Sequence, residues 1–288
     1  MTAAVLRLMA VGGAFALTAG ALGCAGPVAL PPPTAPALSG AERSAVPLGG
    51  ARALAVGPNG RLTVASDDGV QRVELTPGGF ALGPVVSALE LRNITALADP
   101  AGRDLFAATG DGRVVRISEG GLVATAVAPR RDAERAGPFV AVAVGPDGVV
   151  STATDGVPGV QRWRDGVQIA DVAADGPDAV LSPSGLALGD GLWVADAARG
   201  RFVQLGPLGR FKTSRDAPGI RWVGAADGHL LTIQGGTVVV RTADGERVLT
   251  VAVDTAEPLL AVAAVDGELL VLTPSWLASV GRLPPRTE

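Results

Sequence analysis

The sequence is short of the side chains that most catalytic mechanisms use. Its 288 residues include one cysteine, Cys24, one histidine, His229, one lysine, Lys212, and no tyrosine. Nucleophilic and general acid–base catalysis draw mainly on these four residue types, besides carboxylates. We therefore predict no catalytic residue, no bound metal and no cofactor, and the sequence leans away from an enzyme.

Charge is also sparse and nearly balanced. The chain has 28 acidic and 24 basic residues, which gives a formal net charge of −4. The basic residues form no continuous stripe, whereas nucleic-acid-binding proteins gather them into a patch that faces the phosphates. We predict no nucleic-acid partner.

The first recognisable segment of the chain is an N-terminal leader. Arg7 precedes an uncharged apolar run over residues 8–22. As a helix at about 1.5 Å per residue, this run would reach roughly 22 Å, short of a hydrocarbon core of about 30 Å. Its three glycines also suit a signal peptide better than a membrane-spanning helix. We assign residues 1–23 as a signal peptide.

The leader ends in Ala21-Leu22-Gly23-Cys24. This segment resembles a bacterial lipobox, whose cysteine is lipidated and becomes the mature N-terminus. The resemblance implies that Cys24 carries acyl chains such as palmitate and anchors the protein in a lipid bilayer. The alternative is an ordinary secretory signal with an incidental cysteine. The implied location is the bacterial cell envelope, outside the cytoplasm, on the outer membrane if the source is Gram-negative.

Residues 24–39 read as a tether. They include five prolines, which exclude a helix or a central strand and favour extended polyproline II. A stiff spacer fits between a lipid anchor and a folded domain.

From residue 40 to residue 288 the chain repeats itself. A glycine-centred turn recurs about every 40 residues, flanked each time by short apolar runs of β type. In five of the six turns Asn or Asp precedes the glycine, as tight hairpins favour. The turns centre on Gly60, Gly102, Gly148, Gly191, Gly228 and Gly267.

Each repeat predicts several strands. Residues 53–56 and 140–144 are Ala- and Val-rich first strands, residues 61–65 form a second strand, and residues 71–75 alternate as a third. We therefore predict an all-β fold, a six-bladed β-propeller of four-stranded blades. The last repeat lacks a fourth strand, and a spare segment at residues 41–48 precedes the first. We expect this N-terminal segment to close the ring as the outer strand of the last blade.

One segment carries a family pattern. Residues 184–196 read SGLALGDGLWVAD, and residues 201–205 read RFVQL. They resemble the NHL repeat and the related repeats of the SMP-30/gluconolactonase superfamily. The resemblance implies the same propeller fold and raises the alternative of a divergent metal-dependent lactonase or hydrolase.

That family holds a divalent metal in the axial channel with a Glu, an Asn and an Asp. Here Ser184 stands where the family has the Asn, the nearest acid to the Glu position is Glu42 in another context, and residues 218–221 lack the Asp. All three ligand positions depart from the pattern, which is why the enzyme is only the alternative.

A candidate binding face comes from loops. Asp67, Asp111, Asp155 and Asp196 follow the second strands of their repeats, so we expect them on one face of the disc. The longest polar insertion, with Arg130, Arg131 and Arg135, should project from the same face. The competing interpretation is simple turn chemistry, because Asp beside Gly caps tight turns.

The aromatic residues and the histidine add little. Trp163, Trp193, Trp222 and Trp276 could line a ligand platform, but a strand Trp more often packs between blades. His229 follows a turn and is expected to be solvated or loosely packed. We therefore predict a membrane-anchored binding or scaffold lipoprotein whose propeller presents one face to a protein, peptide or glycan.

Overall fold

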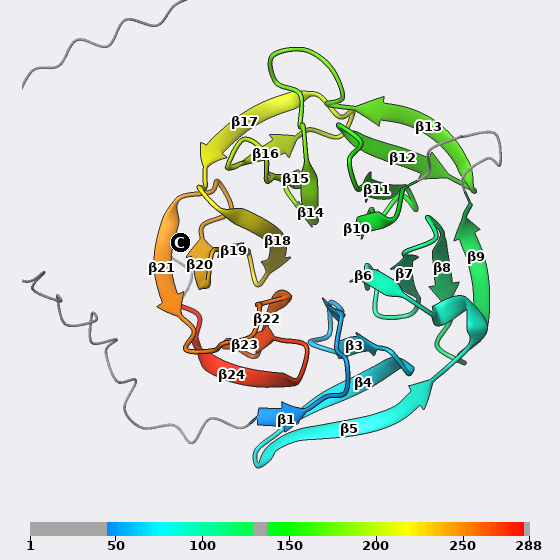
Figure 1. Cartoon of the computed structure of the whole chain (residues 1–288), viewed down its shortest axis with the longest axis vertical. Coiled ribbons are helices and arrows are strands. Elements are labelled where there is room, and N and C mark those ends of the chain that lie inside the picture. Colours follow the sequence, from blue (N-terminus) through cyan, green and yellow to red (C-terminus); the bar gives the residue numbers. More distant parts are fainter. Residues whose placement is uncertain (1–44, 129–136, 285–288) are drawn as a thin grey trace, which may run out of the picture. The chain divides into compact units, whose positions relative to one another are not determined.

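The computed structural model describes residues 45–128 and 137–284, which form six four-stranded antiparallel sheets around a central axis (Figure 1). The predicted six-bladed β-propeller is confirmed. The predicted signal peptide 1–23, Cys24 and the tether 24–39 lie outside the described residues, as do Arg130, Arg131 and Arg135.

The six blades follow one another along the chain. Blade 1 comprises β2 (Ala53–Val56), β3 (Leu62–Ser66), β4 (Gly69–Thr76) and β5 (Gly79–Val86). Blade 2 comprises β6 (Ile94–Ala98), β7 (Leu105–Thr109), β8 (Val114–Ile117) and β9 (Val123–Val127). Blade 3 comprises β10 (Phe139–Val144), β11 (Val150–Thr154), β12 (Val160–Arg164) and β13 (Val167–Val172).

The second half repeats this order. Blade 4 comprises β14 (Pro183–Gly189), β15 (Gly191–Asp196), β16 (Arg201–Leu205) and β17 (Phe211–Asp216). Blade 5 comprises β18 (Ile220–Ala226), β19 (His229–Gln234), β20 (Thr237–Arg241) and β21 (Arg247–Ala252). Blade 6 comprises β22 (Ala261–Val265), β23 (Glu268–Leu272), β24 (Trp276–Arg282) and β1 (Ala45–Pro47).

Blade 6 is the one blade among these that takes a strand from far along the chain. β1 pairs antiparallel with β24, with Ala45 opposite Ala278 and Pro47 opposite Trp276. The backbone N–H of Leu48 also donates to the carbonyl of Ser275 at 2.8 Å. The N-terminal segment therefore closes the ring, as the sequence predicts.

The hydrophobic core lies between neighbouring blades. Six clusters of buried side chains each join two blades, and the cluster between blades 6 and 1 unites Leu62 and Leu54 with Leu270 and Leu277. The side chains of the inner strands are small and mostly apolar because neighbouring blades pack on both faces of each strand. In β11, for example, every residue is buried. The outer strands are half exposed, as in β17.

Turns between first and second strands use the predicted glycines. In Asp227-Gly228 and Asp266-Gly267 both residues have positive φ, 48° and 72° in the first pair and 52° and 75° in the second. Two successive positive φ angles define the type I′ turn of a two-residue hairpin.

The described residues outside the strands include one short 3-10 helix, η1 (Leu89–Leu91). Among the described residues, no helix is long and apolar enough to cross a membrane.

Candidate functional site

Two faces of the disc follow from the strand order. We call the face with the turns between second and third strands the upper face, and the face with the turns between first and second strands the lower face. Because neighbouring strands are antiparallel, each first strand begins at the upper face.

The upper end of the channel is shaped by irregularities in the first strands. β6, β10, β14 and β18 each shift register near their start, so that one residue stands out of the pairing. Such bulges re-aim a side chain and are frequent beside functional sites. With the matching positions of blades 1 and 6, the ring at this level consists of Arg52, Thr95, Val140, Ser184, Arg221 and Leu260.

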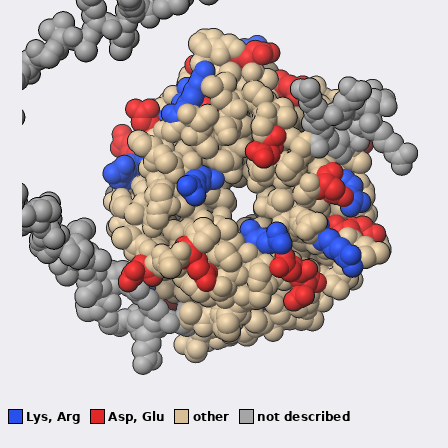
Figure 2. All heavy atoms as spheres, in the orientation of Figure 1, with Lys and Arg blue, Asp and Glu red and all other residues tan. Residues whose placement is uncertain are grey.

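These six residues line the upper end of a cavity of about 380 Å³ along the axis. Below them the walls are made of the Ala-, Val- and Leu-rich first strands. A second hollow of about 450 Å³ shares Arg52, Thr95 and Val140 and also contains Asp67. The upper mouth is therefore a continuous depression in which arginines stand above an apolar channel. Figure 2 shows one face of the disc, where basic side chains lie beside the central opening.

The two mouth arginines differ in how they are engaged. The Arg52 guanidinium donates from Nε to Asp67 Oδ1 at 2.6 Å, which also makes an ion pair. Arg221 is exposed, and no hydrogen bond or ion pair joins it to another described residue. Arg221 is thus the mouth cation whose charge is not already matched within the described chain.

The two hydroxyls of the ring differ in the same way. Thr95 donates to the Phe139 carbonyl, so its hydroxyl ties blade 2 to blade 3. Ser184 Oγ is buried and has no hydrogen-bond partner among the described residues. A buried hydroxyl without a partner is unusual, because desolvating it without a replacement hydrogen bond is costly.

Ser184 is held close to blade 5 by the glycine that follows it. A Cβ at Gly185 would lie 2.7 Å from the Val223 nitrogen and 3.2 Å from Trp222 Cα. Glycine at this position lets β14 approach the start of β18. Ser184 and Arg221 therefore lie on adjacent strands at the same level of the mouth.

The lower end of the channel carries an acid instead. Asp99 lines both the axial cavity and a cleft of about 390 Å³ between blades 1 and 2. Burial raises the pKa of the Asp99 carboxyl, and this outweighs the Gly102 N–H hydrogen bond and the charges of Arg61 and Arg72, which lower it. Sequence analysis did not single out Asp99.

The predicted aspartates lie where expected along the chain, but Asp67 and Asp111 are already engaged by side chains of their own blades. Asp67 pairs with Arg52, and Asp111 accepts from Thr109 and from Arg113 Nε at 2.8 Å. Asp155 is exposed and makes no side-chain hydrogen bond or ion pair to another described residue. At Asp67 and Asp111 the carboxylate is therefore engaged by an arginine side chain of the same blade, a contact that neither of the two interpretations predicted.

Asp196 needs a correction, because it does not follow the second strand but ends it. Its side chain is fully buried. The Ser182 N–H donates to Oδ1 at 3.2 Å, and Arg201 Nε donates to Oδ2 at 3.4 Å. The equivalent positions of the other blades hold neutral residues, Ser66, Thr109, Thr154, Gln234 and Thr273.

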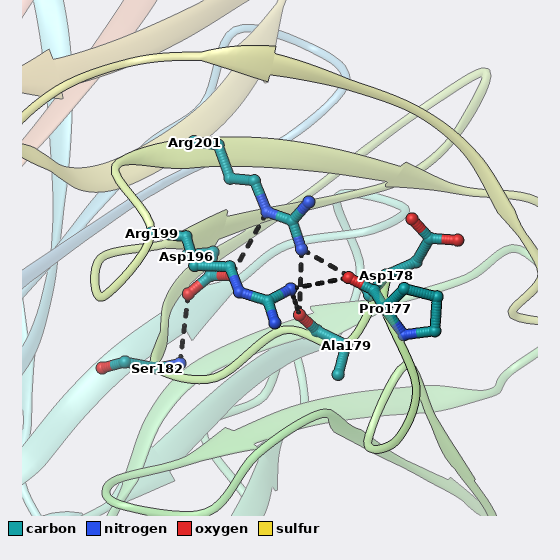
Figure 3. Close-up of polar contacts among 7 residues, drawn as sticks. All are labelled: Pro177, Asp178, Ala179, Ser182, Asp196, Arg199 and Arg201. Carbon is teal, nitrogen blue, oxygen red and sulfur yellow. Dashed lines mark hydrogen bonds and ion pairs between the residues drawn. The ribbon is translucent and has the colours of Figure 1, made fainter.

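Two arginines complete this corner of blade 4. Arg199 Nη1 donates to the Ala179 carbonyl at 2.7 Å, and Arg201 Nη2 donates to the same oxygen at 2.9 Å (Figure 3). They also reach the Pro177 and Asp178 carbonyls. Asp196 therefore fixes the connection between blades 3 and 4 and is not offered to a ligand.

The acids do not converge. The part of the chain that the structure describes holds no group of three or more His, Cys, Asp or Glu side chains placed to bind a metal ion.

The tryptophans and the histidine are strand residues. Trp163 and Trp193 are buried, and Trp222 is the tryptophan that lines the axial cavity. Of the two alternatives expected for His229, solvated or loosely packed, the structure contradicts the first: His229 begins β19, is 7% exposed, and its Nδ1 lies 3.1 Å from the Asp227 carbonyl.

The sequence did not predict the ring of six residues at the upper end of the channel. Arg52, Thr95 and Arg221 stand near the starts of the first strands, seven or eight residues before the glycine turns, so an alignment of the six repeats would have placed them together. Ser184 was noted only as the place of a missing ligand.

No protein-family model and no curated protein matches this chain. Among solved structures, virginiamycin B lyase from Staphylococcus aureus is similar with a TM-score of 0.57 and 16% identity, over 81% of this chain and 82% of that one. A streptogramin B lyase has a TM-score of 0.57 and 14% identity, over 85% and 88%. At these identities the likeness shows the propeller fold alone.

Proposed function

We propose that this chain is a lipid-anchored binding protein of the bacterial cell envelope, whose propeller presents its upper face to a protein, peptide or glycan. The observation that carries the binding role is the upper mouth, a depression over an apolar channel with Arg221 at its edge and no partner for that charge among the described residues. Projecting residues on a rigid scaffold are where recognition concentrates.

The anchor rests on the sequence of residues 1–24. Each buried CH₂ adds about 0.8 kcal/mol to membrane binding, so two or more acyl chains on Cys24 would hold the protein firmly. Cys24→Ser should move the protein from the membrane fraction to the soluble or secreted fraction. The measurement is fractionation of cells that express either form, with thermal melting as the control for folding. A folded variant that stays on the membrane would end the lipoprotein proposal.

The binding role is tested by affinity capture from native membranes with the lipidated full chain as bait. The test variant is Arg221→Glu, and the matched control is Arg116→Glu, which reverses an exposed arginine of β8 outside the mouth. A ligand retained by the wild type and the control but lost with Arg221→Glu supports binding at the upper face. Identical captures with all three baits would contradict it.

The second candidate is a divergent metal-dependent hydrolase of the SMP-30 type. It rests on the resemblance of residues 184–196 to the repeats of that superfamily, and the similar solved structures favour neither candidate. The test measures metal content and hydrolysis of a lactone panel with added Ca²⁺, Zn²⁺ or Mn²⁺. The variant Asp67→Ala suits this test better than an Asp196 variant, because Asp196 is structural. We expect no turnover, and stoichiometric metal with turnover would make this the leading function.

A further inference from the structure

We propose that the upper mouth recognises a carboxylate borne on a short apolar group, the chemistry of a peptide C-terminus that ends in a small residue. This inference rests on the proposed binding function and names its ligand class. It is carried by a cation, a hydroxyl and an apolar channel that meet at one level of the propeller.

The cation is Arg221. Arg221 lines the axial cavity, is exposed, and makes no side-chain hydrogen bond or ion pair with another described residue. A guanidinium presents parallel N–H donors that match the two oxygens of a carboxylate, which gives both charge and orientation. A neutral ligand would form no ion pair with the Arg221 guanidinium.

The hydroxyl is Ser184 Oγ. It lies on the neighbouring strand, is buried, and lacks a partner among the described residues. Because Gly185 brings β14 within close contact of Trp222 and Val223, the hydroxyl sits beside the strand that carries Arg221. Because Ser184 lines the cavity, rotation of its side chain toward the mouth would let a ligand oxygen accept from the hydroxyl and supply the missing hydrogen bond.

The channel selects the rest of the ligand. Its walls below the mouth include Leu97, Val142 and Leu186, and its volume of about 380 Å³ admits a short apolar group. The same walls disfavour a ligand with several charges, because burying an unpaired charge is costly.

Asp67 argues for a monoanion in preference to a phosphate. Asp67 lines the adjoining hollow, and its carboxylate already forms an ion pair with Arg52. A dianion would meet this acid with one unpaired arginine to balance it, whereas a carboxylate needs a single guanidinium. Removal of the Asp67 charge should free Arg52 as a second partner.

The experiment titrates the full chain in detergent with N-acetyl-Ala-Ala, its C-terminal amide, acetate and inorganic phosphate. Binding is followed by calorimetry and by tryptophan fluorescence, since Trp222 lines the cavity. We expect the free acid to bind at least tenfold more tightly than the amide. Arg221→Gln should weaken binding at least tenfold and Ser184→Ala several-fold, while Asp67→Asn should tighten it and Arg116→Gln should leave it unchanged.

Acetate and the dipeptide separate the two sources of a carboxylate. Tighter binding of the dipeptide supports a peptide end, and equal binding of both overturns that part of the inference. Equal affinity for acid and amide, or preference for phosphate, overturns the carboxylate assignment. If no probe binds while membrane capture still depends on Arg221, the binding function stands and this inference fails. Melting curves of the variants confirm that the mouth is intact.

Discussion

Blade 4 and blade 6 differ in the origin of their outer strand and in the side chain that holds their upper corner. Blade 4 is one continuous segment, and its upper corner is locked by the buried carboxylate of Asp196 and by Arg201. Blade 6 borrows β1 from the other end of the chain, and its corner uses Thr273, whose hydroxyl accepts the Trp276 N–H at 3.2 Å. Blade 4 is thus stabilised by a buried ion pair within its own segment, and blade 6 by a strand from the other end of the chain.

The difference teaches that equivalent corners are not energetically equivalent. A buried charge is costly when it loses its partner, while the neutral Thr273 hydroxyl takes part only in modest hydrogen bonds with the Ser275 and Trp276 backbone. The blade with the recognisable sequence motif is therefore expected to be more sensitive to substitution at this corner than the blade that closes the ring.

The largest effect is expected for Asp196→Ala. This change leaves Arg201 without its ion pair and the Ser182 N–H without its acceptor, at a cost of about 3–5 kcal/mol in the free energy of unfolding. Urea denaturation measures it, with Thr273→Ala in blade 6 as the matched control at a cost of about 1 kcal/mol. Equal losses for the two variants would remove the contrast between the corners.

The next effect concerns the borrowed strand. Deletion of residues 40–49 removes β1 and the partly buried Val46 and Leu48, which pack against the cluster between blades 6 and 1. We expect a loss of roughly 2–3 kcal/mol from these side chains, with the edge of β24 exposed. Deletion of residues 25–38 should leave the melting temperature nearly unchanged. If both deletions melted alike, the ring would not depend on β1.

The smallest effect is a pH dependence at the corner of blade 2. Burial alone would raise the pKa of the Asp111 carboxyl, but hydrogen bonds from Arg113 and Thr109 and the charge of Arg113 lower it. Because the folded-state pKa lies below the unfolded value of about 3.9, this stabilisation is present above that pH. It disappears as the pH falls through the folded-state pKa.

Asp111→Asn should therefore cost less than about 1 kcal/mol at neutral pH, because the ion pair is exposed to solvent. Stability curves from pH 7 to pH 2 should converge for wild type and variant at the acid end. A difference that stayed constant across this range would show that Asp111 acts without its charge.

Most of the fold could be predicted from the sequence because its signals are local. The glycine turns and the alternation of residues 71–75 mark strands within a few residues, and the spare N-terminal segment implied closure. The corner of Asp196 could not be read in this way. Its burial depends on the Ser182 backbone and the carbonyl of Ala179, which approach only when blades 3 and 4 pack together.

The candidate site was harder still. Arg52, Ser184 and Arg221 are far apart in the sequence, and only the ring places them around one cavity. The predicted aspartates were chosen for their type and position after strands, but at Asp67 and Asp111 an arginine beside each in the fold already uses the charge.

The closing strand also sets an order of events during synthesis. β1 is the first strand to be made and its partner β24 the last, so the contact between Ala45 and Ala278 must wait for nearly the whole chain. Blades 1 to 5 can form in turn as they emerge, but blade 6 has an open edge until the two ends meet. During that interval β1 of one molecule can pair with β24 of another, and crowded nascent chains would exchange strands into linked oligomers.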